Sequence, residues 1–154
     1  MITKEELIKT AEELTQPSAE AAAEYEAKRD HLAARINSIM EARPDLEKMI
    51  GEGNLEMMRD NHRNHARFIA SLLTAYNPGV LVETVLWVFR AYRSHGFQMT
   101  YWPAQLDTWA EVLKAELGDS SFDEIYPFYH WMIIHQPQFI TLSETQQDIP
   151  IPDH

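Results

Sequence analysis

The sequence predicts an all-α protein of six or seven helices. Apolar residues recur at steps of three and four along most of the 154-residue chain, whereas the alternating pattern of a half-buried strand is almost absent. Capping residues, glycines and prolines divide the chain at short intervals, as helix boundaries do. One segment, 80–94, is apolar on nearly every side, so we expect the other helices to wrap around it in a globin-like or orthogonal helical bundle.

The first three helices are predicted from their boundaries. Thr3 and Glu6 have the spacing of a capping box, which opens a short helix. A longer, alanine-rich helix runs from Ser18 to about Ala42, because the next residue precedes a proline and avoids the helical region. A brief helix follows at 45–50 before a glycine-rich break.

The middle of the chain predicts two long helices. Asn54 is a favourable N-cap residue and opens a helix that continues to about Tyr76. The sequence Asn77-Pro78-Gly79 then breaks the chain. The apolar segment 80–94 follows, and its length without an internal turn residue favours a helix over a buried strand.

Two further helices complete the predicted bundle. One follows Thr100 and ends at Gly118, a residue typical of helix C-termini. The other opens at Ser121, with Glu124 as the second residue of a capping box, and stops at Gln136-Pro137.

Length and composition exclude several classes of protein. We expect residues 1–145 to form a single helical domain and residues 146–154, which hold two prolines, to form an extended tail. The net charge of −11 argues against nucleic acid as a partner, because phosphate binding needs clustered cations. The chain has no cysteine, which excludes disulfides and thiolate metal sites. No apolar run approaches the ~20 residues of a membrane span, and the first residues lack the layout of a signal peptide, so we expect a cytoplasmic protein without membrane contact.

Two histidines interrupt an apolar helix face. His62 and His65 lie in a stripe with steps of three and four whose other members are Leu55, Met58, Ile69, Leu72 and Tyr76. A buried imidazole needs a hydrogen bond, a carboxylate, a metal or a ligand. The stripe therefore predicts a polar spot inside an apolar core, filled either by structural partners or by a bound ligand.

A row of arginines lies beside the histidines on the same predicted helix. Arg59, Arg63 and Arg67 recur at every fourth residue, and Arg90 and Arg93 lie on the next helix. Such rows are most often paired with carboxylates or solvated. The alternative is a binding site for a carboxylate-bearing ligand.

One succession of motifs resembles known families. It consists of Asp60-x-His62-x-x-His65-x-x-Phe68, then Asn77-Pro78, then Trp87, then Arg93-Ser-His-Gly96. Over about residues 54–118, the chain resembles the all-helical modules that precede cobalamin-binding domains in bacterial regulators. It resembles more loosely the non-heme, globin-like sensor domains of bacterial stress-signalling proteins. The resemblance implies a sensory or adaptor role, a small hydrophobic or anionic ligand, and dimerisation. Cobalamin binding is not implied, because the glycine of the cobalamin-ligand motif is absent and no alternating β/α pattern follows.

We therefore predict a small cytoplasmic sensor or regulatory domain, a homodimer, that binds an apolar or anionic small molecule in an internal pocket. The predicted ligand-binding residues are His62, His65, Arg63, Trp87, Arg93 and His95. One alternative is a heme or a divalent metal held by His62, His65 and His95, because a globin also presents two histidines followed by two helices. A second alternative is a module without a ligand that binds a partner protein. No catalytic residue is predicted, since no serine lies in a Gly-x-Ser-x-Gly elbow.

Overall fold

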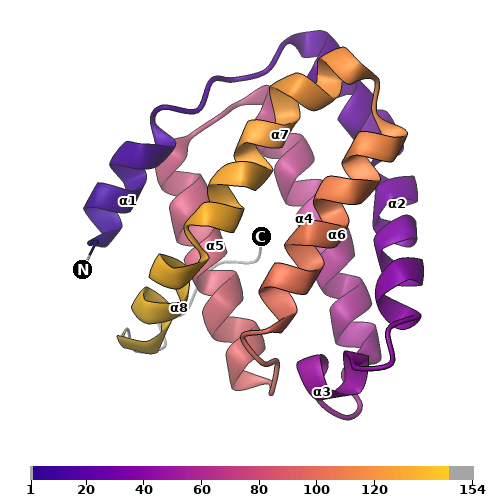
Figure 1. Ribbon diagram of the computed structural model, residues 1–154. Helices are drawn as coiled ribbons and strands as arrows, with labels where there is room; N and C mark the ends of the chain where they lie inside the picture. Colours follow the sequence, from indigo (N-terminus) through magenta and orange to yellow (C-terminus); the bar gives the residue numbers. More distant parts are fainter. Residues whose placement is uncertain (1, 146–154) are drawn as a thin grey trace.

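The structure is a computed structural model that describes residues 2–145, and this part of the chain consists of helices without a strand (Figure 1). The helices are α1 (Lys4–Ala11), α2 (Ala19–Glu41), α3 (Leu46–Ile50), α4 (Leu55–Thr74), α5 (Pro78–Ser94), α6 (Tyr101–Glu116), α7 (Asp119–Ile134) and α8 (Gln136–Thr145). The predicted all-α class is confirmed. The eight helices in the described residues exceed the predicted six or seven.

The additional helix is α8. The predicted end of the preceding helix is confirmed, because α7 stops at Ile134, but the helix that begins at Gln136-Pro137 was not predicted. A proline in the first turn of a helix costs no hydrogen bond, since its N–H would have no partner within the helix. Phe139 and Leu142 of α8 are buried. The predicted extended tail, 146–154, lies outside the described residues.

Two predicted helix starts are confirmed at the level of individual hydrogen bonds. The Thr3 hydroxyl accepts a hydrogen bond from the Glu6 backbone N–H, and the Glu6 carboxylate accepts one from the Thr3 N–H, both at 3.1 Å. This is the capping box that opens α1. The Ser18 hydroxyl accepts from the Ala21 N–H at 3.2 Å and caps α2.

The start of α7 differs from the prediction. The helix begins before Ser121, and Ser121 and Glu124 do not form a capping box. The Ser121 hydroxyl donates instead to Glu24 of α2 at 2.7 Å, and Glu24 also accepts from the Gly118 N–H at 2.8 Å. Glu124 accepts from the N–H and the hydroxyl of Ser18, at 2.7 and 3.0 Å. Each of the two helices thus receives a capping carboxylate from the other.

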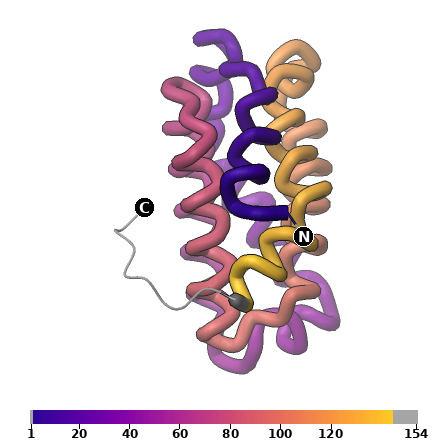
Figure 2. The backbone as a smooth tube through the Cα atoms, turned by 90° about the vertical axis from the view of Figure 1, so that its left-hand side faces the viewer, coloured from indigo at the N-terminus to yellow at the C-terminus, as the bar shows by residue number. Residues whose placement is uncertain are grey.

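The helices form a bundle with two sides. Figure 1 shows α4 and α5 at the back, α6 and α7 in front, and α2 along the right edge. On the α2 side, α2 packs closely against α4, α6 and α7. On the opposite side, α1 and α8 pack against α5, and Figure 2 shows α1 between α5 and the last two helices. Fully buried rings between the helices include Tyr25, Tyr101, Trp109 and Tyr129.

The prediction that the helix at 80–94 forms the centre of the bundle is wrong. The buried residues of α5 are Leu81, Val82, Leu86, Phe89 and Tyr92. The opposite face is open: Val80 is 47% exposed, and the exposed Glu83 pairs with Lys4 of α1 at 2.6 Å. The apolar surface of α5 is wide because α1 and α8 cover part of it in addition to the core. Neither α5 nor any other described helix combines the length and apolarity that crossing a membrane requires.

Candidate ligand site

A small cavity lies between α4, α5, α6 and α7. Its volume is about 40 Å³. Most of its wall is apolar and includes Phe68, Val85, Val88, Leu106 and Met132. The polar side chains on the wall are Asn61, His65, Thr84 and Gln105, and the wall also includes Trp102, whose buried indole N–H has no hydrogen-bond partner among the described residues. Of the four helices around it, only α6 and α7 form one of the closely packed helix pairs.

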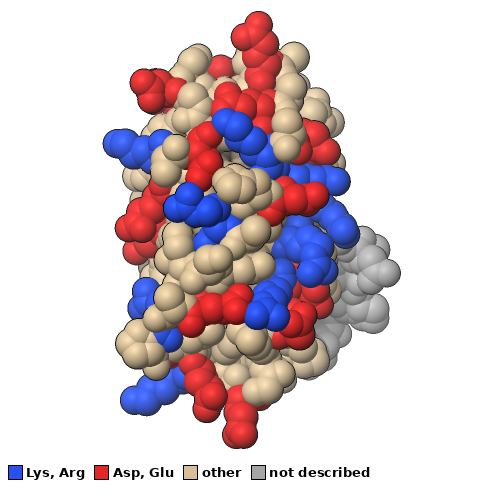
Figure 3. All heavy atoms as spheres, turned by 90° about the vertical axis from the view of Figure 1, so that its right-hand side faces the viewer, with Lys and Arg blue, Asp and Glu red and all other residues tan. Residues whose placement is uncertain are grey.

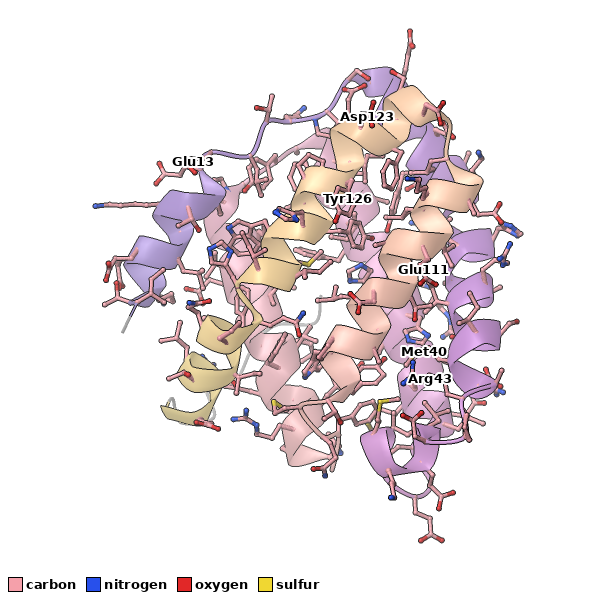
Figure 4. All side chains as sticks on the ribbon, viewed as in Figure 1. Glu13, Met40, Arg43, Glu111, Asp123 and Tyr126 are labelled. Atoms are coloured by element: carbon pink, nitrogen blue, oxygen red, sulfur yellow. The ribbon has the colours of Figure 1, made fainter. Side chains whose placement is uncertain are left out.

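Aromatic side chains fill much of the interior of the bundle, and acidic side chains lie at its surface. Figure 4 shows side-chain rings filling most of the space between α4 and α7, whereas the labelled Glu13, Glu111 and Asp123 occupy exposed positions. On α4, positions 61, 65 and 68 follow one another at steps of four and three, so their side chains reach the cavity from one helix face.

His62 is a structural residue of the core. It is 0% exposed, and both ring nitrogens have protein partners. Nδ1 lies 2.6 Å from the side-chain amide of Asn37 on α2, and Nε2 lies 2.9 Å from the hydroxyl of Tyr101 on α6. The Tyr101 hydroxyl donates in turn to Asn61 at 2.7 Å. His62 therefore has no ring nitrogen left for a ligand.

His65 is half-buried and has one ring nitrogen without a partner. Its Nε2 lies 2.9 Å from the Tyr129 hydroxyl, which lies 2.7 Å from the Tyr25 hydroxyl. Both tyrosine protons find an acceptor only when Tyr25 donates to Tyr129 and Tyr129 donates to the His65 Nε2. The proton of a neutral His65 ring is then on Nδ1, which has no hydrogen-bond partner among the described residues.

Burial keeps this group of side chains uncharged. It lowers the pKa of His62 and of His65 to about 3, and it raises the pKa of the Tyr101 and Tyr129 hydroxyls. Both imidazoles are therefore neutral at neutral pH. Among the described residues, no Lys, Arg, Asp or Glu lines the cavity. The cavity suits a neutral molecule better than an anion, because an anion would be desolvated there without a cation to pair with.

Gln105 is a cavity residue that the sequence analysis missed. It is 2% exposed, and its side-chain amide has no hydrogen-bond partner among residues 2–145. The available signal was a glutamine in register with Trp102 and Trp109, at steps of three and four on a buried face of α6.

Of the six predicted ligand-binding residues, the structure places only His65 on the cavity wall. Arg63 is exposed and pairs with Asp60 at 2.8 Å. Trp87 is half-buried on α5 but does not line the cavity. Arg93, near the end of α5, donates to the Met99 sulfur. The predicted set is therefore not brought together in one place.

The arginine row on α4 is mostly engaged in ion pairs. Arg59 pairs with Glu41 of α2 at 2.6 Å and with Glu56 on its own helix. With the Arg63–Asp60 pair, this confirms the interpretation of the row as a paired face for two of its three members. Figure 3 shows acidic and basic side chains interleaved over the face of the molecule on which α2 lies.

The histidines proposed for a heme or a metal do not meet. His95 is exposed at the end of α5, and its carbonyl accepts a hydrogen bond from the Asn54 amide at 2.8 Å, so this amide does not cap α4 as predicted. Within residues 2–145, no three His, Cys, Asp or Glu side chains are placed to share one metal ion. A cavity of about 40 Å³ is also far below the roughly 300–1,000 Å³ of pockets that enclose larger ligands. The geometry therefore favours neither a heme nor a divalent metal at these histidines.

Comparisons with protein-family models, with curated proteins and with solved structures found no match to this chain. The cavity and its polar side chains therefore carry the functional proposal.

Proposed function

We propose that the protein is a small helical binding domain that holds a small neutral molecule in the cavity between α4, α5, α6 and α7. The observation that supports the proposal is a mostly apolar cavity of about 40 Å³ whose wall includes the imidazole of His65 and the amide of Gln105. Protein interiors contain few voids larger than a water molecule. A concave apolar space with a few polar groups is the usual form of a small-molecule site.

Size and charge narrow the range of ligands. A volume of about 40 Å³ has room for about three water molecules, which corresponds to a ligand of about four non-hydrogen atoms. The absence of charged residues from the described wall supports the apolar option of the sequence-based prediction rather than the anionic one. The arginines that suggested an anion are outside the cavity.

The position of the cavity offers a route from ligand to helix packing. A molecule in the cavity would touch α4 and α5, which are not closely packed against each other. It would favour the arrangement in which α5 is held against α4, and α1 and α8, which pack on α5, would move with it. On this basis we extend the proposal to a sensor or regulatory role, the role that the resemblance to bacterial sensor modules also implies.

The homodimer, the globin-like packing and the cytoplasmic location remain sequence-based predictions within this proposal. Native mass spectrometry of protein freshly purified from cells measures the oligomeric state and the mass of any retained ligand. A dimer would support the regulatory role, and a monomer would contradict the predicted homodimer.

Xenon binding followed by ¹H–¹⁵N NMR tests the proposal, because xenon enters apolar cavities. We expect saturable shifts of the amides around the cavity, and their loss in Val85→Phe, whose larger side chain fills the space. Val80→Phe is the matched control, because Val80 lies on the same helix, is 47% exposed and does not line the cavity. The absence of saturable shifts, or equal shifts in the two variants, would contradict the proposal.

A further inference from the structure

The amide of Gln105 is an unpaired polar group on the cavity wall. The residue is 2% exposed, and none of the described residues forms a hydrogen bond with its side chain. Buried polar groups in folded proteins are nearly always paired, and a single unpaired one destabilises the fold. A group that is buried, unpaired and on the wall of a cavity is expected to bond to what the cavity holds.

His65 adds a second polar group of defined character. The relay from Tyr25 through Tyr129 to Nε2 fixes the neutral tautomer with the proton on Nδ1. The ring is held in place by this hydrogen bond and by the indole of Trp109, with the ring centroids 4.6 Å apart. A residue of the cavity wall therefore has a fixed ring whose N–H donor has no partner among the described residues.

Donors exceed acceptors among these groups. The Gln105 amide offers two N–H bonds and one carbonyl oxygen, and His65 offers one N–H bond. Unpaired donors are rarer in proteins than carbonyl oxygens with a free lone pair. A ligand that satisfies the donors of Gln105 and His65 must present an oxygen acceptor, and the rest of it must be mostly apolar because most of the remaining wall is apolar.

We propose that the cavity selects a molecule with an apolar body and one carbonyl or hydroxyl oxygen, to which Gln105 and His65 supply the hydrogen bonds. This inference rests on the proposed function, and it adds the chemical class of the ligand and two specificity-determining residues. A purely apolar molecule of the same shape would leave the Gln105 amide unpaired.

Acetone and isobutene are suitable probes, because both have four non-hydrogen atoms in the same arrangement and differ by an oxygen in place of a CH₂ group. The dissociation constants of both are measured by ¹H–¹⁵N NMR titration of the full chain. Acetone is better solvated by water than isobutene, so the effect of each variant on each probe is compared rather than the two affinities themselves.

We expect Gln105→Leu to weaken acetone binding about tenfold and to leave isobutene binding within about twofold of the parent value. His65→Phe keeps a ring beside Trp109 and is expected to show the same selective loss. Gln138→Leu is the matched control, since Gln138 is a half-buried glutamine of α8 that does not line the cavity. It should change neither affinity.

A second readout does not depend on variants. Long-range ¹H–¹⁵N spectra of the imidazoles are expected to show His65 protonated on Nδ1 and to show this nitrogen shifting when acetone is added. Protonation of Nε2, or equal effects of Gln105→Leu on both probes, would overturn the inference. The proposed function would still stand in that case if isobutene and xenon bind. Failure of xenon, isobutene and acetone to bind would overturn both.

Discussion

His62 and His65 lie one turn apart on α4, and their imidazoles have different surroundings. His62 is 0% exposed, and its two nitrogens bond to Asn37 and Tyr101. His65 has one nitrogen bonded to Tyr129 and lies on the wall of a cavity. The first imidazole joins α4 to α2 and α6, whereas the second leaves a donor unused.

The difference follows from what packs on each side of α4. On the α2 side the helices are close together and supply polar partners at hydrogen-bonding distance. On the α5 side the neighbouring helix is less close, and a cavity takes the place that a partner side chain would fill. A polar residue in an apolar stripe is therefore structural when all its polar atoms have hydrogen-bond partners and is a candidate for ligand binding when one has none. The partners come from other helices, so the sequence of its own helix does not decide between the two.

Acidification is expected to change the free energy of unfolding of the protein more than any other perturbation, through its two buried histidines. Each has a pKa of about 3 in the folded protein, caused mainly by burial, against 6.5 in an unfolded chain. Between these values the unfolded chain binds protons that the folded protein does not, so the free energy of unfolding decreases as the pH falls below 6.5. We expect a loss whose slope approaches about 1.4 kcal/mol per pH unit for each histidine below pH 6.5, or about 3 kcal/mol for both between pH 6.5 and 5. Urea unfolding at a series of pH values measures it.

The control for acidification is removal of one histidine at a time. His62→Leu and His65→Leu should each reduce the pH dependence by about half between pH 6.5 and 5. Glu24, whose carboxylate has a pKa lowered to about 2 mainly by Lys28, loses its contribution only below its ordinary pKa of 4.5, so it lies outside this range. An unchanged slope in both variants would contradict the assignment of the pH dependence to these residues.

Removal of the two imidazoles at neutral pH should separate their structural roles. His62→Leu leaves the buried Tyr101 hydroxyl with one bond fewer and removes the contact to Asn37, so we expect a loss of about 3 kcal/mol. His65→Leu leaves Tyr129 bonded to Tyr25 and should cost only about 1 kcal/mol. Urea unfolding at pH 7.5 compares them, and an equal or larger loss for His65→Leu would contradict the distinction.

Hydrogen exchange should show the same asymmetry between the sides of the bundle. We expect the amides of α5 to exchange about tenfold faster than those of α4, because α5 has an open face and no close contact with α4. Acetone or xenon in the cavity should slow the exchange of α5 and leave that of α2 unchanged. Faster exchange of α4 than of α5 in the free protein would reverse the comparison.

The smallest effects are expected from two side-chain amides, that of Asn37, which is bonded to His62, and that of Gln105 on the cavity wall. Asn37→Ala removes a partner of His62 and should cost about 1 kcal/mol. Gln105→Leu removes an unpaired buried amide and should leave stability unchanged or raise it by about 1 kcal/mol. Thermal unfolding of both variants without ligand is the measurement. A loss of more than 1 kcal/mol in Gln105→Leu would show that the amide has a partner within the folded protein.

The positions of seven helices could be predicted because their signals are local. Prolines, glycines and capping residues mark boundaries within a few residues of one another, as the Thr3–Glu6 capping box shows. The eighth helix was missed because Pro137 was interpreted as a stop, although a proline is equally compatible with a helix start. The central position assigned to α5 was wrong because apolarity does not specify which helices provide the cover.

The candidate site could be predicted only in part. The stripe identified His62 and His65 as a polar spot, but their partners come from distant segments. Asn37 is 25 residues from His62, and Tyr129 is 64 residues from His65. Whether a nitrogen is paired depends on these long-range contacts, which periodicity does not contain. Arginine spacing predicted a paired face with an anion site as the alternative, and the structure places the paired Arg59 and Arg63 outside the cavity.

The exchange of carboxylates between α2 and α7 also affects the order of folding. Glu24 and Gly118 are 94 residues apart, and Ser18 and Glu124 are 106 residues apart. The start of α1, whose whole capping box lies within its own turn, can form early. The start of α2 has only the local Ser18–Ala21 cap and the start of α7 has none, and both lack their carboxylate partners until most of the chain has been brought together. We expect the first turns of α2 and α7, which lie at the same end of the bundle (Figure 1), to become fully protected late and at the same rate, as one cooperative unit.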